Sequence, residues 1–154
     1  MGDYKLTHHE LSQYRELKDR ILELDEAIFD TEQELAELEK YNMSISPVAN
    51  GLPKGNAKID KICDFVITLQ NDRARLQNSI EVYTAERTAL KYRLHKIVSA
   101  VNKITDEQLR EIVKLHYFQN ESIIKVAFKF HLSQNGVYKK LERAIGGRYR
   151  KHRN

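Results

Sequence analysis

Apolar side chains recur along residues 7–41 with the spacing of a coiled-coil heptad. One column holds Tyr14, Ile21, Ile28 and Leu35, and the second holds Leu17, Leu24, Thr31 and Leu38. Seven of these eight positions are apolar, which is typical of a helix that packs along another helix. Thr7 and Glu10 have the spacing of a capping box, so we expect the helix to begin near Thr7 and to end near residue 41.

A second pair of columns predicts a helix from about residue 57 to about 102. The first column holds Ile59, Val66, Arg73, Ile80, Arg87, Leu94 and Val101, and the second holds Ile62, Leu69, Leu76, Tyr83, Leu90 and Ile97. Both prolines and two glycines lie between the two helices, in residues 42–56, which predicts a linker. This linker is long enough for the helices to fold back as an antiparallel hairpin, which we assign to residues 1–102.

The charge distribution favours this pairing of the two helices. Residues 1–41 hold 5 bases and 12 acids, whereas residues 57–101 hold 8 bases and 5 acids. Arg73 and Arg87 lie within the apolar seam, so acids of the first helix or of a second subunit are expected to pair with them. The first helix is also too short to cover the second. We therefore expect an exposed apolar stretch that another subunit buries, and favour a homodimer or larger oligomer over a self-contained hairpin.

Residues 103–154 predict three short helices and a basic tail. Thr105 and Gln108 have capping-box spacing before a helix from Asp106 to about Phe118. Ser122 can cap a helix from Ile123 to about Phe130, and Ser133 can cap a last helix from Gln134 to about Ile145. Gly146 and Gly147 are expected to end that helix. Residues 102–154 hold 12 bases and 5 acids, a balance that suggests a polyanionic partner.

The run IVKLHYFQNESIIKVAFKFHLSQNGVYKKLERA resembles region 4 of bacterial sigma factors, a helix-turn-helix that reads the −35 promoter element. The resemblance covers about 40 residues without gaps and rests on the apolar and polar spacing from Leu115 to Ala144. Two departures are His131, where the family usually has glycine in the turn, and Gly136, which weakens the last helix. The fold expected is therefore all-α, with a long helical hairpin followed by a sigma region 4-like helix-turn-helix.

The resemblance implies which residues contact double-stranded DNA. In helix-turn-helix docking the first residues of the second helix reach base edges in the major groove. The expected base contacts are Gln134, Asn135, Tyr138 and Lys139. The expected phosphate contacts are Ser133, Lys140, Arg143, Arg148, Arg150, Lys151 and Arg153. The alternative is that these residues form a solvated basic helix face and tail.

A helical first part joined to a sigma region 4-like end is similar to small phage and prophage transcription regulators, including late-gene regulators of the ArpU and RinA type. This likeness implies a sequence-specific regulator of phage genes in the cytoplasm of a bacterial host, with RNA polymerase as a further partner. Two alternatives stay open. One is the DNA-recognition (small) subunit of a phage terminase, which forms rings. The other is a coiled-coil scaffold whose helix-turn-helix binds protein.

The sequence contains no motif that indicates an enzyme. No Ser/His/Asp arrangement, phosphate-binding glycine loop or paired catalytic carboxylate stands out, so we expect no catalytic residues, cofactor or small-molecule substrate. The six histidines lack zinc-ligand spacing, so no metal site is expected. Cys63 is the single cysteine, and its apolar neighbours suggest a buried thiol. No run of 18 apolar residues occurs, so no membrane contact is expected.

Overall fold

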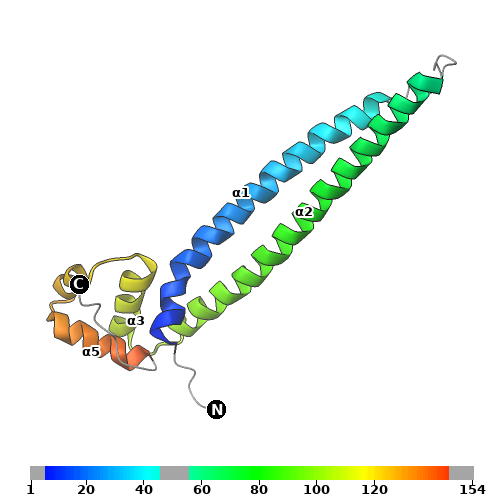
Figure 1. The fold of residues 1–154 in the computed structure, drawn as a ribbon. Helices are drawn as coiled ribbons and strands as arrows, with labels where there is room; N and C mark the ends of the chain where they lie inside the picture. The colour runs from blue at the N-terminus through cyan, green and yellow to red at the C-terminus, as the bar shows by residue number, and fades with distance from the viewer. Residues whose placement is uncertain (1–5, 46–55, 146–154) are drawn as a thin grey trace, which may run out of the picture. The chain divides into compact units, whose positions relative to one another are not determined.

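Every regular element in the described residues is helical. The computed structural model describes residues 6–45 and 56–145. In chain order it contains α1 (His8–Ile45), α2 (Asn56–Asn102), α3 (Glu107–Val113), the π-helical turn η2 (Lys114–Phe118), α4 (Ile123–Lys129) and α5 (Gln134–Ala144), as Figure 1 shows. The predicted all-α class and the long N-terminal helical hairpin are confirmed for these residues.

The chain divides into two compact units at positions different from the predicted boundary between residues 102 and 103. One unit is Leu22–Thr88, and the other combines Met1–Ile21 with Ala89–Asn154. The first turns of α1 and the last turns of α2 therefore group with the short C-terminal helices. Each unit is described below by itself.

The beginning of α1 follows the predicted capping box. The Thr7 backbone N–H donates to Glu10 Oε2 at 2.8 Å, and the Glu10 N–H donates to Thr7 Oγ1 at 3.2 Å. Two backbone donors that the helix itself leaves unpaired are thus satisfied at its N-terminus. The helix continues to Ile45, and α2 already begins at Asn56, so parts of the predicted linker are helical. Residues 46–55 lie outside the described residues.

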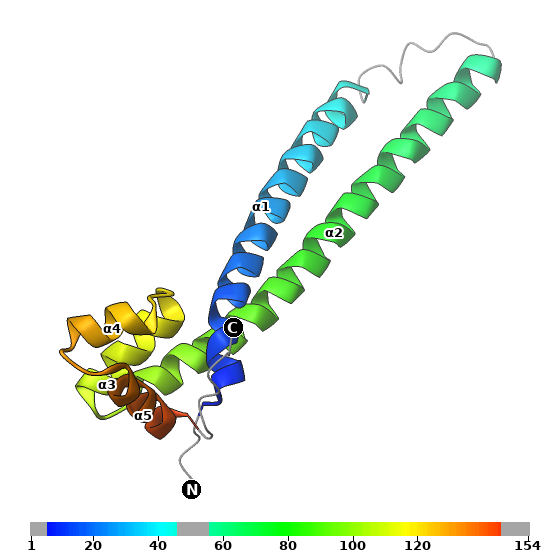
Figure 2. The same cartoon turned by 60° about the vertical axis from the view of Figure 1, so that its left-hand side comes forward.

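Residues 22–88 form an antiparallel pair of helices, α1 and α2, which lie side by side in Figures 1 and 2. The predicted columns form the seam, and the following seam residues are buried: Leu24, Ile28, Leu69 and Leu76. Both seam arginines pair with acids of α1. Arg87 donates to Asp25 at 2.8 Å, and Arg73 lies 3.2 Å from Glu39. Acids of the first helix, one of the two sources that the sequence left open, are therefore partners of both arginines.

The beginning of α2 carries exposed apolar side chains. Phe65 and Ile67 are about half exposed, and Ile62 is exposed although it belongs to the predicted seam. The expected exposed apolar stretch is therefore present, whereas its burial by another subunit stays a prediction. Cys63 is also exposed, so the predicted buried thiol is wrong. Cys63 belongs to neither heptad column, so the packing of α2 on α1 does not bury it, and its apolar neighbours Ile62 and Phe65 are exposed as well.

The other unit has its core around the short helices. Residues with almost no exposed surface come from five elements: Leu11, Val101, Ile112, Val113, Val126, Val137 and Leu141. The predicted helix from Asp106 to Phe118 changes to a π-helical turn after Val113, where the Gln119 N–H donates to the Lys114 carbonyl five residues back. Within this turn Tyr117 is buried, and its hydroxyl lies 2.6 Å from Nδ1 of His8.

The α3 cap differs from the predicted capping box of Thr105 and Gln108. Asp106 is the N-cap residue, and its Oδ1 accepts from the Leu109 N–H at 3.2 Å. The helix begins one residue later than the box requires, because an aspartate both accepts this bond and places negative charge at the positive end of the helix. The Gln108 side chain is directed to α5, where its Oε1 accepts from Lys140.

Candidate nucleic-acid interface

The helices α4 and α5 are joined by a tight turn that begins with a left-handed residue. Ser122 caps α4 by accepting from the Lys125 N–H, as predicted. After Phe130 the chain takes φ 55° at His131. The Leu132 N–H then donates to the Ala127 carbonyl at 2.9 Å, and the His131 N–H donates to the Phe128 carbonyl at 3.3 Å. These two bonds form a Schellman motif, in which glycine is the usual left-handed residue.

Ser133 closes the turn and starts α5. Its Oγ accepts from the Gly136 N–H at 3.0 Å, which confirms the predicted cap. A Cβ atom on Gly136 would lie 3.2 Å from that oxygen, a closer contact than most side chains accept. The glycine that departs from the sigma pattern thus leaves room for the capping hydroxyl. The capping bond that glycine permits here offsets the weakening that a glycine causes within a helix.

The two sides of α5 differ sharply in character. Val137 and Leu141 are completely buried and fix the helix to the rest of its unit. The predicted base-contact residues lie elsewhere on the helix: Gln134, Asn135 and Lys139 are exposed, and Tyr138 is half-buried. The structure therefore presents two amides and one amine from the first half of α5. Because other side chains of α5 form its contacts with the core, these exposed polar side chains can enter a DNA groove without loss of core packing.

The predicted phosphate contacts divide into three groups. Ser133 and Arg143 are exposed. Lys140 is only 23% exposed, and its amine donates to Gln108 Oε1 at 2.7 Å and lies 4.0 Å from Asp106 Oδ2. Lys140 therefore fastens α5 to the start of α3 and does not join the exposed group. The remaining predicted contacts lie outside the described residues: Arg148, Arg150, Lys151 and Arg153.

Glu142 is a feature of this surface that the sequence interpretation left without a role. It is exposed, and it lies one turn after Tyr138 and two turns after Asn135 on the same side of α5. An acid there repels a phosphate backbone, so it restricts any polyanion to the first half of the helix and to the Arg143 flank. The sequence alone could have placed Glu142 on this side of the helix, because it follows Asn135 by two helical turns.

The outer side of α4 carries an exposed apolar pair that the sequence interpretation also missed. Ile124 is 65% exposed and Phe128 is 84% exposed. They lie four residues apart, next to Lys125 and Lys129, while the opposite side of α4 is buried through Val126 and its neighbours. Six of the eight residues from 123 to 130 are apolar, which is more than one buried side of a helix can hold. A helical projection of these residues would therefore have predicted exposed apolar side chains on α4.

The described residues contain no group of three or more histidine, cysteine or acidic side chains placed to hold a metal ion. Among the described helices, none has an apolar run long enough to cross a bilayer.

Comparison of the chain with models of known protein families, with curated proteins and with solved structures finds no match.

Proposed function

We propose that this protein is a sequence-specific, double-stranded DNA-binding transcription regulator in which α4 and α5 act as a sigma region 4-like helix-turn-helix. The observation that carries the proposal is the exposed polar first half of α5, opposite the fully buried Val137 and Leu141. The resemblance to sigma region 4 adds RNA polymerase as a partner, and the likeness to small phage and prophage regulators adds a phage or prophage gene as the source. Regulation requires no covalent chemistry from the chain.

The exposed side chains of α5 suit base recognition. The amides of Gln134 and Asn135 can each donate to and accept from adenine in the major groove, and the Lys139 amine can donate to guanine or to a phosphate. The backbone N–H groups at the beginning of α5 and the hydroxyl of Ser133 are suited to a phosphate oxygen. Recognition is thus proposed for the first half of the helix, away from Glu142.

Arg143 is the proposed phosphate contact within the described part of the chain. Lys140 would have to exchange its bonds to Gln108 and Asp106 for a phosphate, so its contribution to affinity is expected to be smaller. The basic residues after Ile145 are proposed to add sequence-independent attraction, because a charged arm gains affinity through counterion release.

The test begins with selection of fragments that the purified chain retains from its source genome. Enrichment of a promoter-proximal site supports the regulator, whereas enrichment beside DNA-packaging genes supports the terminase alternative. The affinity for the selected site is then measured by fluorescence anisotropy across a series of salt concentrations. Binding that is equal for the selected site and for unrelated duplexes would contradict sequence-specific recognition.

The residue assignment is tested with Lys139→Ala combined with Arg143→Ala. Loss of the Arg143 phosphate contact reduces the slope of log affinity against log salt by about 0.9, and loss of the Lys139 charge beside the phosphates reduces it further. The matched control is Lys61→Ala combined with Lys91→Ala, which removes two exposed bases from α2 and should leave the slope unchanged. An unchanged slope in the first variant would remove α5 from the interface.

A second candidate function is protein binding through the helix-turn-helix. The exposed pair of Ile124 and Phe128 favours it, because large apolar side chains at 65% and 84% exposure are typical of contact surfaces. Ile124→Ser combined with Phe128→Ser should leave DNA affinity intact if α5 binds DNA. In a protein-binding scaffold, no duplex is retained at low salt, and the same variant loses the protein partner.

A further inference from the structure

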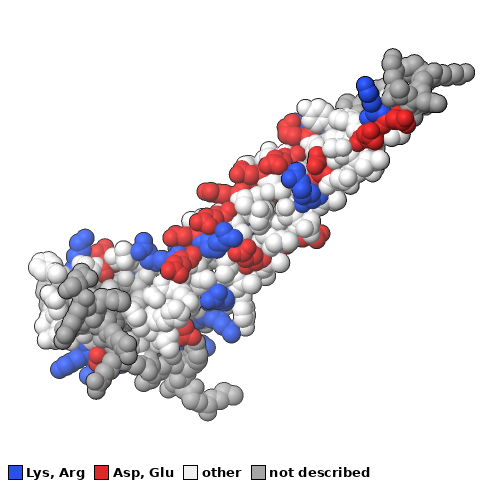
Figure 3. Space-filling model, in the orientation of Figure 1, with Lys and Arg blue, Asp and Glu red and all other residues white. Residues whose placement is uncertain are grey.

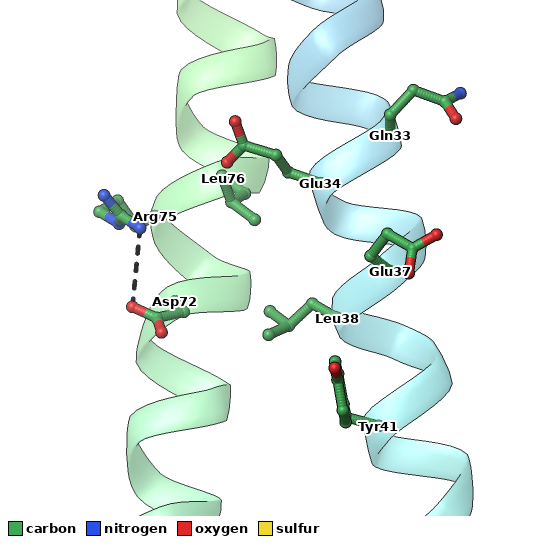
Figure 4. A pocket seen from close by; sticks show the side chains of 8 residues that line it. All are labelled: Gln33, Glu34, Glu37, Leu38, Tyr41, Asp72, Arg75 and Leu76. Atoms are coloured by element: carbon green, nitrogen blue, oxygen red, sulfur yellow. Dashed lines mark ion pairs between the residues drawn. The ribbon is translucent and has the colours of Figure 1, made fainter.

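The surface of the hairpin is dominated by charge. Acidic side chains follow α1 in Figure 3. A shallow hollow between α1 and α2 has Glu34, Asp72 and Arg75 in its lining, and the last two of these pair at 3.7 Å (Figure 4). The first turn of α5 differs, because it contains two neighbours that can react with each other. They are Asn135 and Gly136, and in the described residues an asparagine precedes a glycine at this place alone.

An asparagine that precedes a glycine can lose its side-chain amide without an enzyme. The backbone nitrogen of the glycine gives its proton to hydroxide and bonds to Cγ of the asparagine. The bond from Cγ to Nδ2 breaks, and Nδ2 takes a proton from water and leaves as ammonia. Water then opens the five-membered succinimide at either carbonyl, which gives aspartate or isoaspartate. Glycine favours the first step because no Cβ stands beside the attacking nitrogen.

The fold restrains this reaction in two ways. The Gly136 N–H donates to Ser133 Oγ at 3.0 Å, so the attacking nitrogen is held in the cap of α5. Closure of the succinimide also requires the ψ angle of Asn135 to leave the helical value of about −42°. Both restraints end when the first turn of α5 opens. Hydroxide and water can then reach Asn135, because its side chain is exposed.

The opening that the reaction needs is local. Val137 and Leu141 are completely buried and hold the rest of α5, so its first turn can open while they stay in place. Gly136 precedes the first bond of the helix ladder, which the Val137 N–H makes to the Ser133 carbonyl. The Ser133 side chain is therefore the restraint to alter, and a typical serine cap lowers the population of the open turn by about 5-fold.

We propose that Asn135 is a site of spontaneous deamidation that the Ser133 cap restrains, and that its conversion ends DNA binding by α5. The second part rests on the proposed function. A carboxylate accepts hydrogen bonds and does not donate them, so it cannot make the paired contact with adenine that the amide can make. It also adds negative charge beside the phosphates, and it lies four residues before Lys139, whose amine it attracts.

The two products affect α5 differently. Aspartate leaves the backbone unchanged, and its charge suits the first turn of a helix, so α5 stays folded and loses a base contact. Isoaspartate lengthens the main chain by one carbon atom, which moves the Gly136 N–H away from Ser133 Oγ. DNA contacts at the beginning of α5 keep the turn closed. Free chains therefore lose their activity with time, whereas bound chains are protected.

The first experiment measures the conversion in the full chain without DNA. Wild type, Ser133→Ala and Ser133→Thr are incubated in mildly alkaline buffer, and peptide mapping by mass spectrometry measures both products at position 135. Ser133→Ala removes the cap and should convert about 5-fold faster than the wild type, whereas Ser133→Thr keeps a capping hydroxyl and should convert at nearly the wild-type rate. Circular dichroism checks that both variants remain helical. Equal rates in the three chains overturn the proposal.

A second comparison does not depend on a variant. Wild type in urea has no helix at position 135, so it should convert at least about 5-fold faster than the native wild type. A native chain that converts as fast as the chain in urea shows that the fold does not restrain the site. A Ser133→Ala chain that stays intact while the chain in urea converts also overturns the proposal.

The second experiment tests the effect on DNA binding. Partly converted wild type is passed over an immobilised duplex of the selected site, and the retained and unretained chains are mapped. Conversion at position 135 should be at least about 5-fold lower in the retained chains, the factor expected for loss of one paired base contact. The matched control is Asn50, which precedes Gly51, lies outside the described residues and has no proposed DNA contact. Its conversion should be equal in both fractions.

The outcomes separate the two proposals. Equal conversion at position 135 in the retained and unretained chains overturns the loss of DNA binding. A duplex that retains no chain contradicts the proposed function and with it the effect on DNA binding. The rates measured without DNA still decide whether Asn135 is a deamidation site restrained by Ser133.

Discussion

Replacement of His131 by glycine tests whether the turn between α4 and α5 is strained. The left-handed conformation costs an ordinary L-residue about 1–2 kcal/mol, because its Cβ approaches a backbone oxygen. His131 has φ 55° and an exposed side chain, so removal of the Cβ relieves this cost without loss of packing. Glycine also lowers the stability by about 0.5–1 kcal/mol, because it gives the unfolded chain more conformational freedom. We expect a net stabilisation of about 0.5–1 kcal/mol for His131→Gly.

Hydrogen exchange at the backbone amides of Val137 and Leu141 measures this change within the affected unit. Both residues are completely buried, and their amides exchange only when α5 opens. A gain of about 0.5–1 kcal/mol slows their exchange by about 2- to 5-fold. His131→Ala keeps the Cβ and should give no gain, and Asn120→Gly, at φ 56°, should give a smaller gain because asparagine tolerates this region better. Exchange in His131→Gly that is no slower than in His131→Ala would refute the reasoning.

Two further predictions concern charges. Glu142→Gln should raise affinity for duplex DNA by up to about 5-fold at low salt, since an exposed charge pair is worth about 0.2–1 kcal/mol. Fluorescence anisotropy measures this affinity, and an unchanged value would place the phosphates away from Glu142. A double-mutant cycle, followed by thermal unfolding, should give a larger coupling energy for Asp25 with Arg87 than for Glu39 with Arg73. The first pair is closer, 2.8 Å against 3.2 Å, and its arginine is 28% exposed against 47%. Equal couplings would show that this difference in burial has no energetic effect.

Much of the hairpin could be predicted from the sequence because its signals are local and periodic. The heptad columns predicted which side of each long helix is buried. The two arginines within the columns predicted acidic partners, but which acids these are, Asp25 and Glu39, came from the structure. The caps at Thr7, Ser122 and Ser133 were also predictable, since each depends on residues three positions apart. Helix ends without such a cap, as at residue 41, were placed less accurately.

The parts that could not be predicted depend on contacts between distant residues. The π-helical turn after Val113 allows Tyr117 to contact His8 and Phe118 to stack on Tyr14 at 3.8 Å between ring centroids. No local pattern in residues 107–118 distinguishes it from an ordinary helix. The attachment of Lys140 to Gln108 is similarly invisible, because a helical projection of α5 alone does not include α3. Residue type was therefore sufficient to predict the candidate interface, whereas the partners of Lys140 could be found only in the tertiary structure.

The contact between His8 and Tyr117 has a consequence for synthesis on the ribosome. The two residues are separated by 109 positions, and Leu11 of the same core is completed by partners equally late in the chain. At about 5–20 residues per second, the first turns of α1 emerge roughly 5–20 s before the residues that cover them. During that interval the apolar side chains at the beginning of α1 lack the partners that bury them in the folded chain, so this core closes only after residue 117 has been synthesised.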